Sequence, residues 1–158
     1  MTTSHTPDRT DDREADLPQG TVDALVQLSF LVQGVLARTA AEHDLSLIQA
    51  RLLGILRDRR PGMLELAGFL GLDKSSMTGL VSRAEKRGLV QRLPSPHDGR
   101  GVLVSLTPLG RQLTDTCGAE TARQIASLTE SLTSGEHTQV GILSRKILRS
   151  AAAGESDG

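Results

Sequence analysis

Aromatic side chains are almost missing from this sequence, which has two Phe and no Trp or Tyr among its 158 residues. Its core must therefore be built from aliphatic side chains. The hydrophobic fraction is 37%, which is enough for a core but not a generous one. Chains of this size with modest apolar content often complete their burial in a subunit interface.

Cysteine is equally scarce, since Cys117 stands alone. A single cysteine forms no internal disulfide, so a disulfide-stapled secreted scaffold is excluded, and a buried structural thiol is expected. The residues after Met1 are polar and resemble no signal peptide. No apolar run approaches the ~18 residues that span a bilayer. We therefore expect a cytoplasmic protein with no membrane partner.

The residues that usually carry catalysis form no recognisable constellation. Four histidines are scattered without metal-ligand spacing, no Gly-rich phosphate loop follows a strand, and Cys117 has no evident base. The sequence therefore predicts no catalytic residues, no metal and no cofactor, and an enzyme is the weakest reading.

Charge is nearly balanced overall, at −1, which by itself argues against a nucleic-acid partner. Its distribution is uneven. Residues 1–20 carry five acidic and two basic residues, whereas residues 74–111 carry seven basic and two acidic residues. The second segment is the candidate for a phosphate-facing surface, although an ordinary solvated face would look similar.

Hydrophobic spacing and turn formers predict the order of the elements. We expect disordered tails at 1–20 and 151–158, because these segments are polar and rich in turn formers. Between them we expect helices over 21–42, 46–58, 63–70, 73–87, 107–132 and 134–150, with strands at 89–93 and 102–106. Capping boxes begin at Ser46 and Thr133, and Thr107-Pro108 is a helix start. Asp73 or Ser75 can cap the helix that follows Gly71.

The short helix, the tight turn at Gly71 and the next helix have helix-turn-helix spacing. The second helix has an apolar back made of Met77, Leu80, Val81 and Ala84. Its other side carries candidate contacts to phosphates or base edges in the major groove: Lys74, Ser75, Ser76, Thr78, Ser82, Arg83 and Lys86. Capping and solvation would explain the hydroxyl residues equally well, and for Ser75 the two readings stand even.

The loop between the two strands carries Asp98 and Arg100. An arginine at a hairpin tip can enter the minor groove, where narrow A·T tracts concentrate negative potential. Asp98 then makes sense as the carboxylate that orients the Arg100 guanidinium. The alternative is a surface charge pair without consequence.

Together these segments resemble a MarR-family winged helix. The resemblance covers roughly residues 21–150 and lies in the combined spacing of several runs: 64–67, 72–78, 85–92, 98–100 and 106–110. It implies a mainly α fold with a small β-hairpin wing, that is, a winged helix-turn-helix plus a helical dimerisation region. The implied DNA-binding lobe covers about 46–106, and the dimerisation helices cover about 21–42 and 107–150.

The resemblance also implies a function. Members of that family are homodimers that bind near-palindromic double-stranded DNA, and a small molecule often releases them. We therefore expect a repressor that occludes a promoter, with the match at Asp98 and Arg100 supporting the wing contact. With so few aromatics, ring stacking on a small-molecule effector could come from little besides Phe30 and Phe69. We expect Phe30 and His43 as effector contacts, although a lone His is more often a solvated or capping group. The alternative is a winged-helix protein-interaction module without specific DNA binding.

Overall fold

The computed structural model describes residue 18 and residues 20–97 and 99–154. The chain forms a mostly helical fold with one two-stranded antiparallel hairpin, which confirms the expected class. In order the elements are α1 (Thr21–Glu42), α2 (Leu47–Leu56), α3 (Met63–Leu70), α4 (Lys74–Lys86), β1 (Val90–Pro94), β2 (Val102–Leu106), α5 (Pro108–Leu128) and α6 (Ser134–Gly154).

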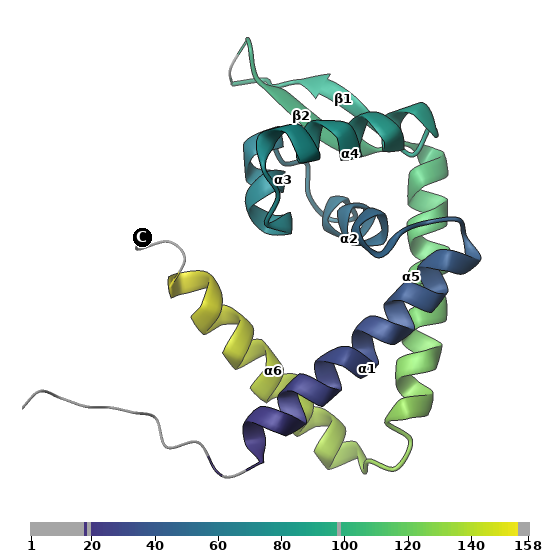
Figure 1. The fold of residues 1–158 in the computed structure, drawn as a ribbon, viewed down its shortest axis with the longest axis vertical. Helices are drawn as coiled ribbons and strands as arrows, with labels where there is room; N and C mark the ends of the chain where they lie inside the picture. The colour runs from purple at the N-terminus through teal and green to yellow at the C-terminus, as the bar shows by residue number, and fades with distance from the viewer. Residues whose placement is uncertain (1–17, 19, 98, 155–158) are drawn as a thin grey trace, which may run out of the picture.

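The elements divide into a compact lobe and three long helices (Figure 1). The lobe contains α2, α3, α4 and the hairpin. Helices α1 and α5 lead away from it and pack against each other, and α6 folds back from the far end of α5. The chain therefore places a helix-turn-helix with a wing at one end and long helices at the other.

The core of the lobe is aliphatic, as the lack of aromatics requires. Its most buried side chains come from every element of the lobe: Leu52, Leu56, Leu66, Met77, Leu80, Val81, Val90 and Val104. Both phenylalanines are exposed. Burying a Leu or Val side chain contributes roughly 1.5–3 kcal/mol, so this set is the main stabilising element of the lobe.

The predicted helix boundaries are set by local hydrogen bonds. The Ser46 hydroxyl accepts from the Gln49 amide at 3.3 Å, and the Gln49 side chain accepts from the Ser46 amide at 2.9 Å, which confirms the capping box. Asp73, not Ser75, caps α4, since its carboxylate accepts from the Ser76 amide at 2.8 Å.

The hairpin begins one residue later than predicted. Gly88 has φ +72°, and the Leu89 amide donates to the Ala84 carbonyl at 3.0 Å, so Leu89 belongs to the motif that ends α4. Pairing then runs from Val90 opposite Leu106 to Pro94 opposite Val102.

Helix α6 extends further than the sequence suggested. We expected a disordered tail from residue 151, but α6 continues to Gly154. The reason is that residues 151–153 are alanines, the strongest helix formers, with no breaker before Gly154. The expected tail segments 1–17 and 155–158 lie outside the described residues.

Helix α1 also corrects an expectation. By length and composition alone, it is long and apolar enough to cross a membrane, contrary to our reading of the sequence. Polar residues such as Gln27 and Ser29 interrupt the apolar positions of α1, so the sequence shows no continuous apolar run although its mean hydropathy is high. Much of its apolar surface is exposed, as is that of α6, of which no residue is buried.

Candidate nucleic-acid interface

Helix α4 lies across the outside of the lobe, with its apolar back packed into the core. Met77, Leu80, Val81 and Ala84 are buried, as predicted from the sequence. The candidate contact residues are all exposed on the other side: Lys74, Ser75, Ser76, Thr78, Ser82, Arg83 and Lys86. The structure therefore gathers the candidate contacts of α4 on one surface of that helix.

Two of the candidate hydroxyls are engaged within α4 itself. The Ser76 hydroxyl donates to the Asp73 carboxylate at 2.7 Å, and the Thr78 hydroxyl donates to the Lys74 carbonyl at 2.9 Å. The amide and hydroxyl of Ser76 together hold the pKa of Asp73 below the usual value of an aspartate. At pH values above the usual aspartate pKa, this cap therefore stabilises α4. The stabilisation is lost as the pH falls through the lowered pKa of Asp73.

The long cations of α4 remain on its outer surface. Arg83 folds back along the helix, with Nη1 3.2 Å from the position that a Cβ would take on Gly79. The lack of a side chain at Gly79 thus leaves room for the Arg83 guanidinium against the helix backbone. Within the described part of the chain, Lys74, Arg83 and Lys86 form no ion pair.

Arg92 is a residue that the sequence analysis missed. From β1 it reaches back to α4, pairing with the Glu85 carboxylate through Nη1 and donating to the Ser82 hydroxyl through Nη2 at 3.1 Å. It neutralises the one acidic side chain of α4 and fixes the wing against the helix. The available signal was the pair of opposite charges on either side of the helix-ending Gly88.

Arg87 holds the other end of α4. Its guanidinium donates to the carbonyls of Asp44, at 2.7 Å, and His43, at 3.5 Å, in the turn between α1 and α2. Asp44 has φ +56°, so this turn is tightly folded. Arg87 therefore links the end of α4 to the long helix α1.

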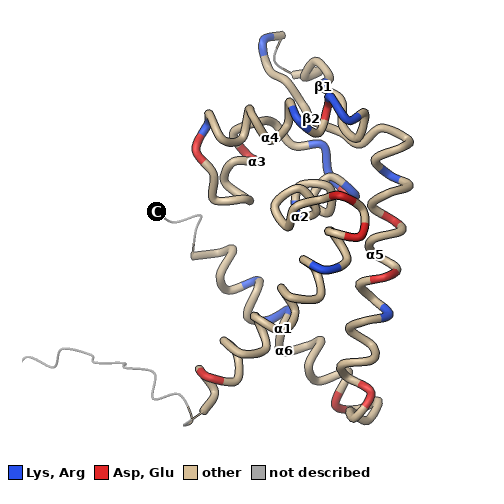
Figure 2. The backbone as a smooth tube through the Cα atoms, turned by 45° about the vertical axis from the view of Figure 1, so that its right-hand side comes forward, with Lys and Arg blue, Asp and Glu red and all other residues tan. Residues whose placement is uncertain are grey.

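The wing loop closes at its base, where the Ser95 amide donates to the Gly101 carbonyl at 2.9 Å. Arg100 is exposed near the tip of this loop. Asp98 lies outside the described residues, so its predicted orienting contact stays a prediction. Basic residues lie along α4 and the hairpin (Figure 2), within the segment 74–111 that carries the excess of positive charge in the sequence.

A cavity of about 600 Å³ lies between the lobe and the long helices. Its walls are mostly aliphatic and come mainly from α1, α2 and α5, and the polar lining residues include Arg57 and, from α6, His137. Neither Phe30 nor His43, the predicted effector contacts, lines it. Phe30 is 67% exposed on α1.

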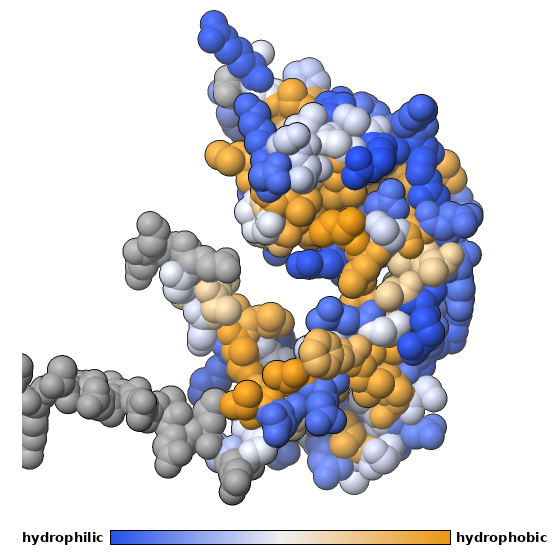
Figure 3. Space-filling view, in the orientation of Figure 1, coloured by the Kyte–Doolittle hydropathy of each residue, from blue (hydrophilic) through white to orange (hydrophobic). Residues whose placement is uncertain are grey.

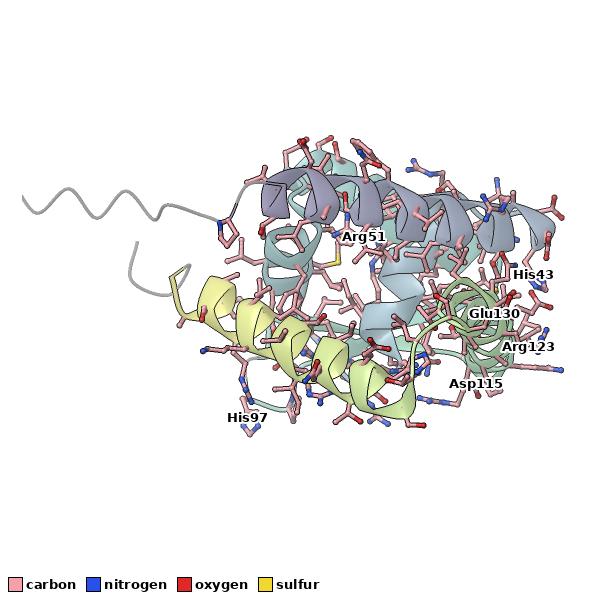
Figure 4. The ribbon with its side chains drawn as sticks, turned by 90° about the horizontal axis from the view of Figure 1, so that it is seen from below. His43, Arg51, His97, Asp115, Arg123 and Glu130 are labelled. Carbon is pink, nitrogen blue, oxygen red and sulfur yellow. The ribbon has the colours of Figure 1, made fainter. Side chains whose placement is uncertain are left out.

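His43 lies beside α5 (Figure 4), and its Nε2 is 2.8 Å from the Glu120 carboxylate. This pair ties the end of α1 to α5. The structure therefore assigns His43 a contact between helices and does not bring it together with Phe30 at the cavity.

Cys117, expected as a buried structural thiol, lines the same cavity and is partly buried. Burial raises the pKa of its thiol, and the charges of Glu120 and Glu42 add to the effect. A thiol of raised pKa is a poor nucleophile at neutral pH. Across residues 20–97 and 99–154, no group of three or more His, Cys, Asp or Glu could hold a metal ion.

Comparisons with known proteins agree on one family. A model described as "MarR family" matches residues 43–101. The chain is 36% identical over 118 residues to the HTH-type transcriptional repressor NicR of Pseudomonas putida, covering 73% of this chain and 74% of that protein. It is also 36% identical over 86 residues to the multiple antibiotic resistance protein MarR of Salmonella typhimurium, covering 54% of this chain and 60% of that relative's length.

Solved structures share the fold over most of the chain. The apo form of wild-type MarR from E. coli superposes with a TM-score of 0.68 at 28% identity, covering 84% of this chain and 97% of that one. A mutant MarR from E. coli complexed with operator DNA gives 0.62 at 28% identity, covering 82% and 96%.

Proposed function

Because this chain belongs to the MarR family, we propose that it is a sequence-specific DNA-binding transcriptional regulator that acts as a dimeric repressor. One observation carries the proposal: α4 exposes a row of polar and basic side chains, and its acidic Glu85 is neutralised by Arg92. In this proposal α4 enters the major groove, where Arg83 and Lys86 reach base edges or phosphates. Lys74, Ser75, Ser76, Thr78 and Ser82 contribute shorter contacts.

The wing completes the proposed interface. Arg100 enters the minor groove beside the site that α4 reads, and Asp98 orients it. Arg92 keeps the hairpin and α4 in a fixed relation, so that both reach the duplex together. In this proposal the fixed distance between α4 and the wing contributes to the sequence specificity of DNA binding.

We propose that two copies pair through α1 and α6, with α5 alongside. Apolar side chains exposed on these helices support this: Val22, Leu25, Leu28, Leu31, Val140, Leu143, Ile147 and Leu148. Figure 3 shows hydrophobic residues gathered over α6 and the neighbouring part of α1. The DNA-binding lobe then covers about 46–106 and the dimerisation helices about 21–42 and 107–150. Light scattering should give twice the chain mass of 16.8 kDa, and a monomer would contradict this pairing.

The same pairing accounts for α1 without a membrane. A partner subunit would cover the apolar surface that makes α1 resemble a membrane span. A cytoplasmic location follows from a role at DNA. The family contains regulators rather than enzymes, so the enzyme alternative is set aside.

We further propose that a small molecule occupies the 600 Å³ cavity and releases the DNA. The cavity lies between the lobe and the long helices. In the proposed dimer, these long helices set the distance between the lobes of the two subunits. On DNA, the α4 helices of the two subunits would lie one DNA turn apart, ~34–36 Å. A ligand that binds more tightly to a dimer with a different distance between them would lower DNA affinity. Repression would follow from occlusion of the promoter. A compound that raises the thermal midpoint but leaves DNA affinity unchanged would contradict this role.

DNA binding is tested by titrating the protein into a labelled duplex at several salt concentrations and measuring its affinity by fluorescence anisotropy. Affinity should fall about 10³-fold or more between 50 and 200 mM salt, as expected for 6–10 phosphate contacts. The Arg83→Gln variant should bind about tenfold more weakly, whereas Arg123→Gln, an exposed change on α5, should not.

An absence of binding at 50 mM salt would instead favour the alternative, a winged-helix module that binds a protein. Equal affinities of the Arg83 and Arg123 variants would remove α4 from the interface, even if the duplex were bound.

A further inference from the structure

A second cavity, of about 500 Å³, lies where the end of α2, the hairpin and the first turns of α5 meet. Unlike the first cavity it is rich in hydrogen-bond donors. Four arginines line it, together with Gln91 and Ser105, and Asp58 is the only acidic residue in the lining. The arginines are Arg57, Arg59, Arg60 and Arg111. They come from two segments far apart in the sequence, so the fold and not a simple charge run brings them together.

Three of the four guanidinium groups already make a contact. Arg57 pairs with Asp58, Nε to Oδ2 at 3.1 Å, and Arg59 lies over the Phe69 ring at 5.0 Å from its centroid. Arg111 donates one hydrogen bond, at 3.3 Å, to the Arg57 carbonyl. Among the residues that the structure describes, neither Arg60 nor Arg111 is paired with a carboxylate.

The floor of the cavity holds a buried hydroxyl. Ser105 is only 6% exposed, and its Oγ accepts from Gln91 Nε2 at the long distance of 3.4 Å. Within residues 20–97 and 99–154, the Ser105 hydroxyl donates to no acceptor. A serine can donate as well as accept, and Gln91 has a second N–H, so both retain donor capacity.

From these donors we propose that the second cavity is a binding site for a phosphate-type oxyanion, held between Arg60 and Arg111 above Ser105. Paired guanidinium groups match the geometry of phosphate oxygens, and charge-assisted hydrogen bonds are roughly twice as strong as neutral ones. The ligand is either free phosphate or a phosphodiester of the DNA backbone. Both present the same oxygens, and the test separates them.

The first arm uses inorganic phosphate alone. Circular dichroism follows the thermal midpoint of the full chain as phosphate replaces chloride at constant ionic strength. A free-phosphate site should raise the midpoint saturably, and Arg60→Gln should weaken the apparent phosphate affinity at least tenfold. Arg60 makes no recorded hydrogen bond in the described part of the chain, so this variant should fold. Arg123→Gln is the matched control for lost charge.

The second arm measures duplex binding against salt for the same variants. If a DNA phosphodiester occupies the site, Arg60→Gln should lower the slope of log K against log salt by about 0.9 per subunit. Phosphate then need not shift the midpoint. The Arg111→Lys variant keeps the positive charge but loses the planar guanidinium that can donate two parallel hydrogen bonds. It should therefore weaken the binding of either ligand.

The result that overturns the proposal is an Arg60→Gln variant that matches the Arg123→Gln control in both arms. The first arm does not depend on the proposed regulator function, because it requires no DNA. Loss of DNA binding by the wild type would therefore leave the phosphate result interpretable.

Discussion

The Gly110→Ala variant should unfold at a markedly lower temperature than the wild type. Gly110 lies in the first turn of α5, and a Cβ there would fall 1.9 Å from the Leu89 carbonyl oxygen. No side chain can move aside, since the obstacle is backbone. We expect a loss of about 3 kcal/mol, the upper part of the range for overpacking. That corresponds to roughly 10 °C in the midpoint for a chain of this size.

The reason for the close contact is the junction between α5 and the wing. The Thr107 amide donates to the Leu89 carbonyl at 3.1 Å, and the Thr107 hydroxyl accepts from the Gly110 amide at 3.0 Å. A methyl group at residue 110 would force these hydrogen bonds apart. Since Leu89 connects α4 to β1, the change should also disturb the interface proposed for DNA.

Gly118 provides the matched control on the same helix. A Cβ there would meet nothing within 4 Å. Gly118→Ala should therefore leave the midpoint unchanged or raise it, because alanine is the better helix former by about 0.5–1 kcal/mol. Thermal unfolding followed at 222 nm suits a protein without Trp or Tyr. Equal midpoints for the two variants would contradict the packing at Leu89.

Arg100→Ala should cause the second large effect, on DNA rather than on stability. In a dimer the change removes one proposed minor-groove contact from each subunit. At about 1 kcal/mol or more for each contact, affinity should fall roughly 30-fold or further. Arg100 is exposed near the tip of the loop, so the thermal midpoint should hardly change.

The base preference supplies the diagnostic readout. Because narrow A·T tracts attract an inserted arginine, the variant should lose preference for A·T pairs flanking the site while retaining the bases read by α4. Anisotropy with duplexes that differ only in those flanks measures this. A variant with reduced affinity but unchanged flank preference would reduce Arg100 to a general phosphate contact.

Much of the lobe was predictable from sequence because its signals are local. The cap at Ser46 and the apolar back of α4 each depend on residues three or four positions apart. The exposed face of α4 follows directly from the same spacing. Its role at DNA remains a prediction.

The contacts that join elements were not predictable in this way. Arg87 reaches the turn at residues 43 and 44, and His43 pairs with Glu120, 77 positions away. Such pairs depend on how α1, α4 and α5 pack, and many alternative partners were equally plausible from sequence. His43 does not line the cavity for the same reason, and its contact with an effector stays a prediction.

Selection from a random DNA pool should show whether this chain binds a specific duplex as a dimer. The full chain is mixed with random duplexes, and bound molecules are amplified and sequenced over several rounds. We expect enrichment of a near-palindrome with half-sites one helical turn apart, and weaker enrichment by the Arg83→Gln and Arg100→Ala variants. A pool that stays random after several rounds at low salt would contradict it.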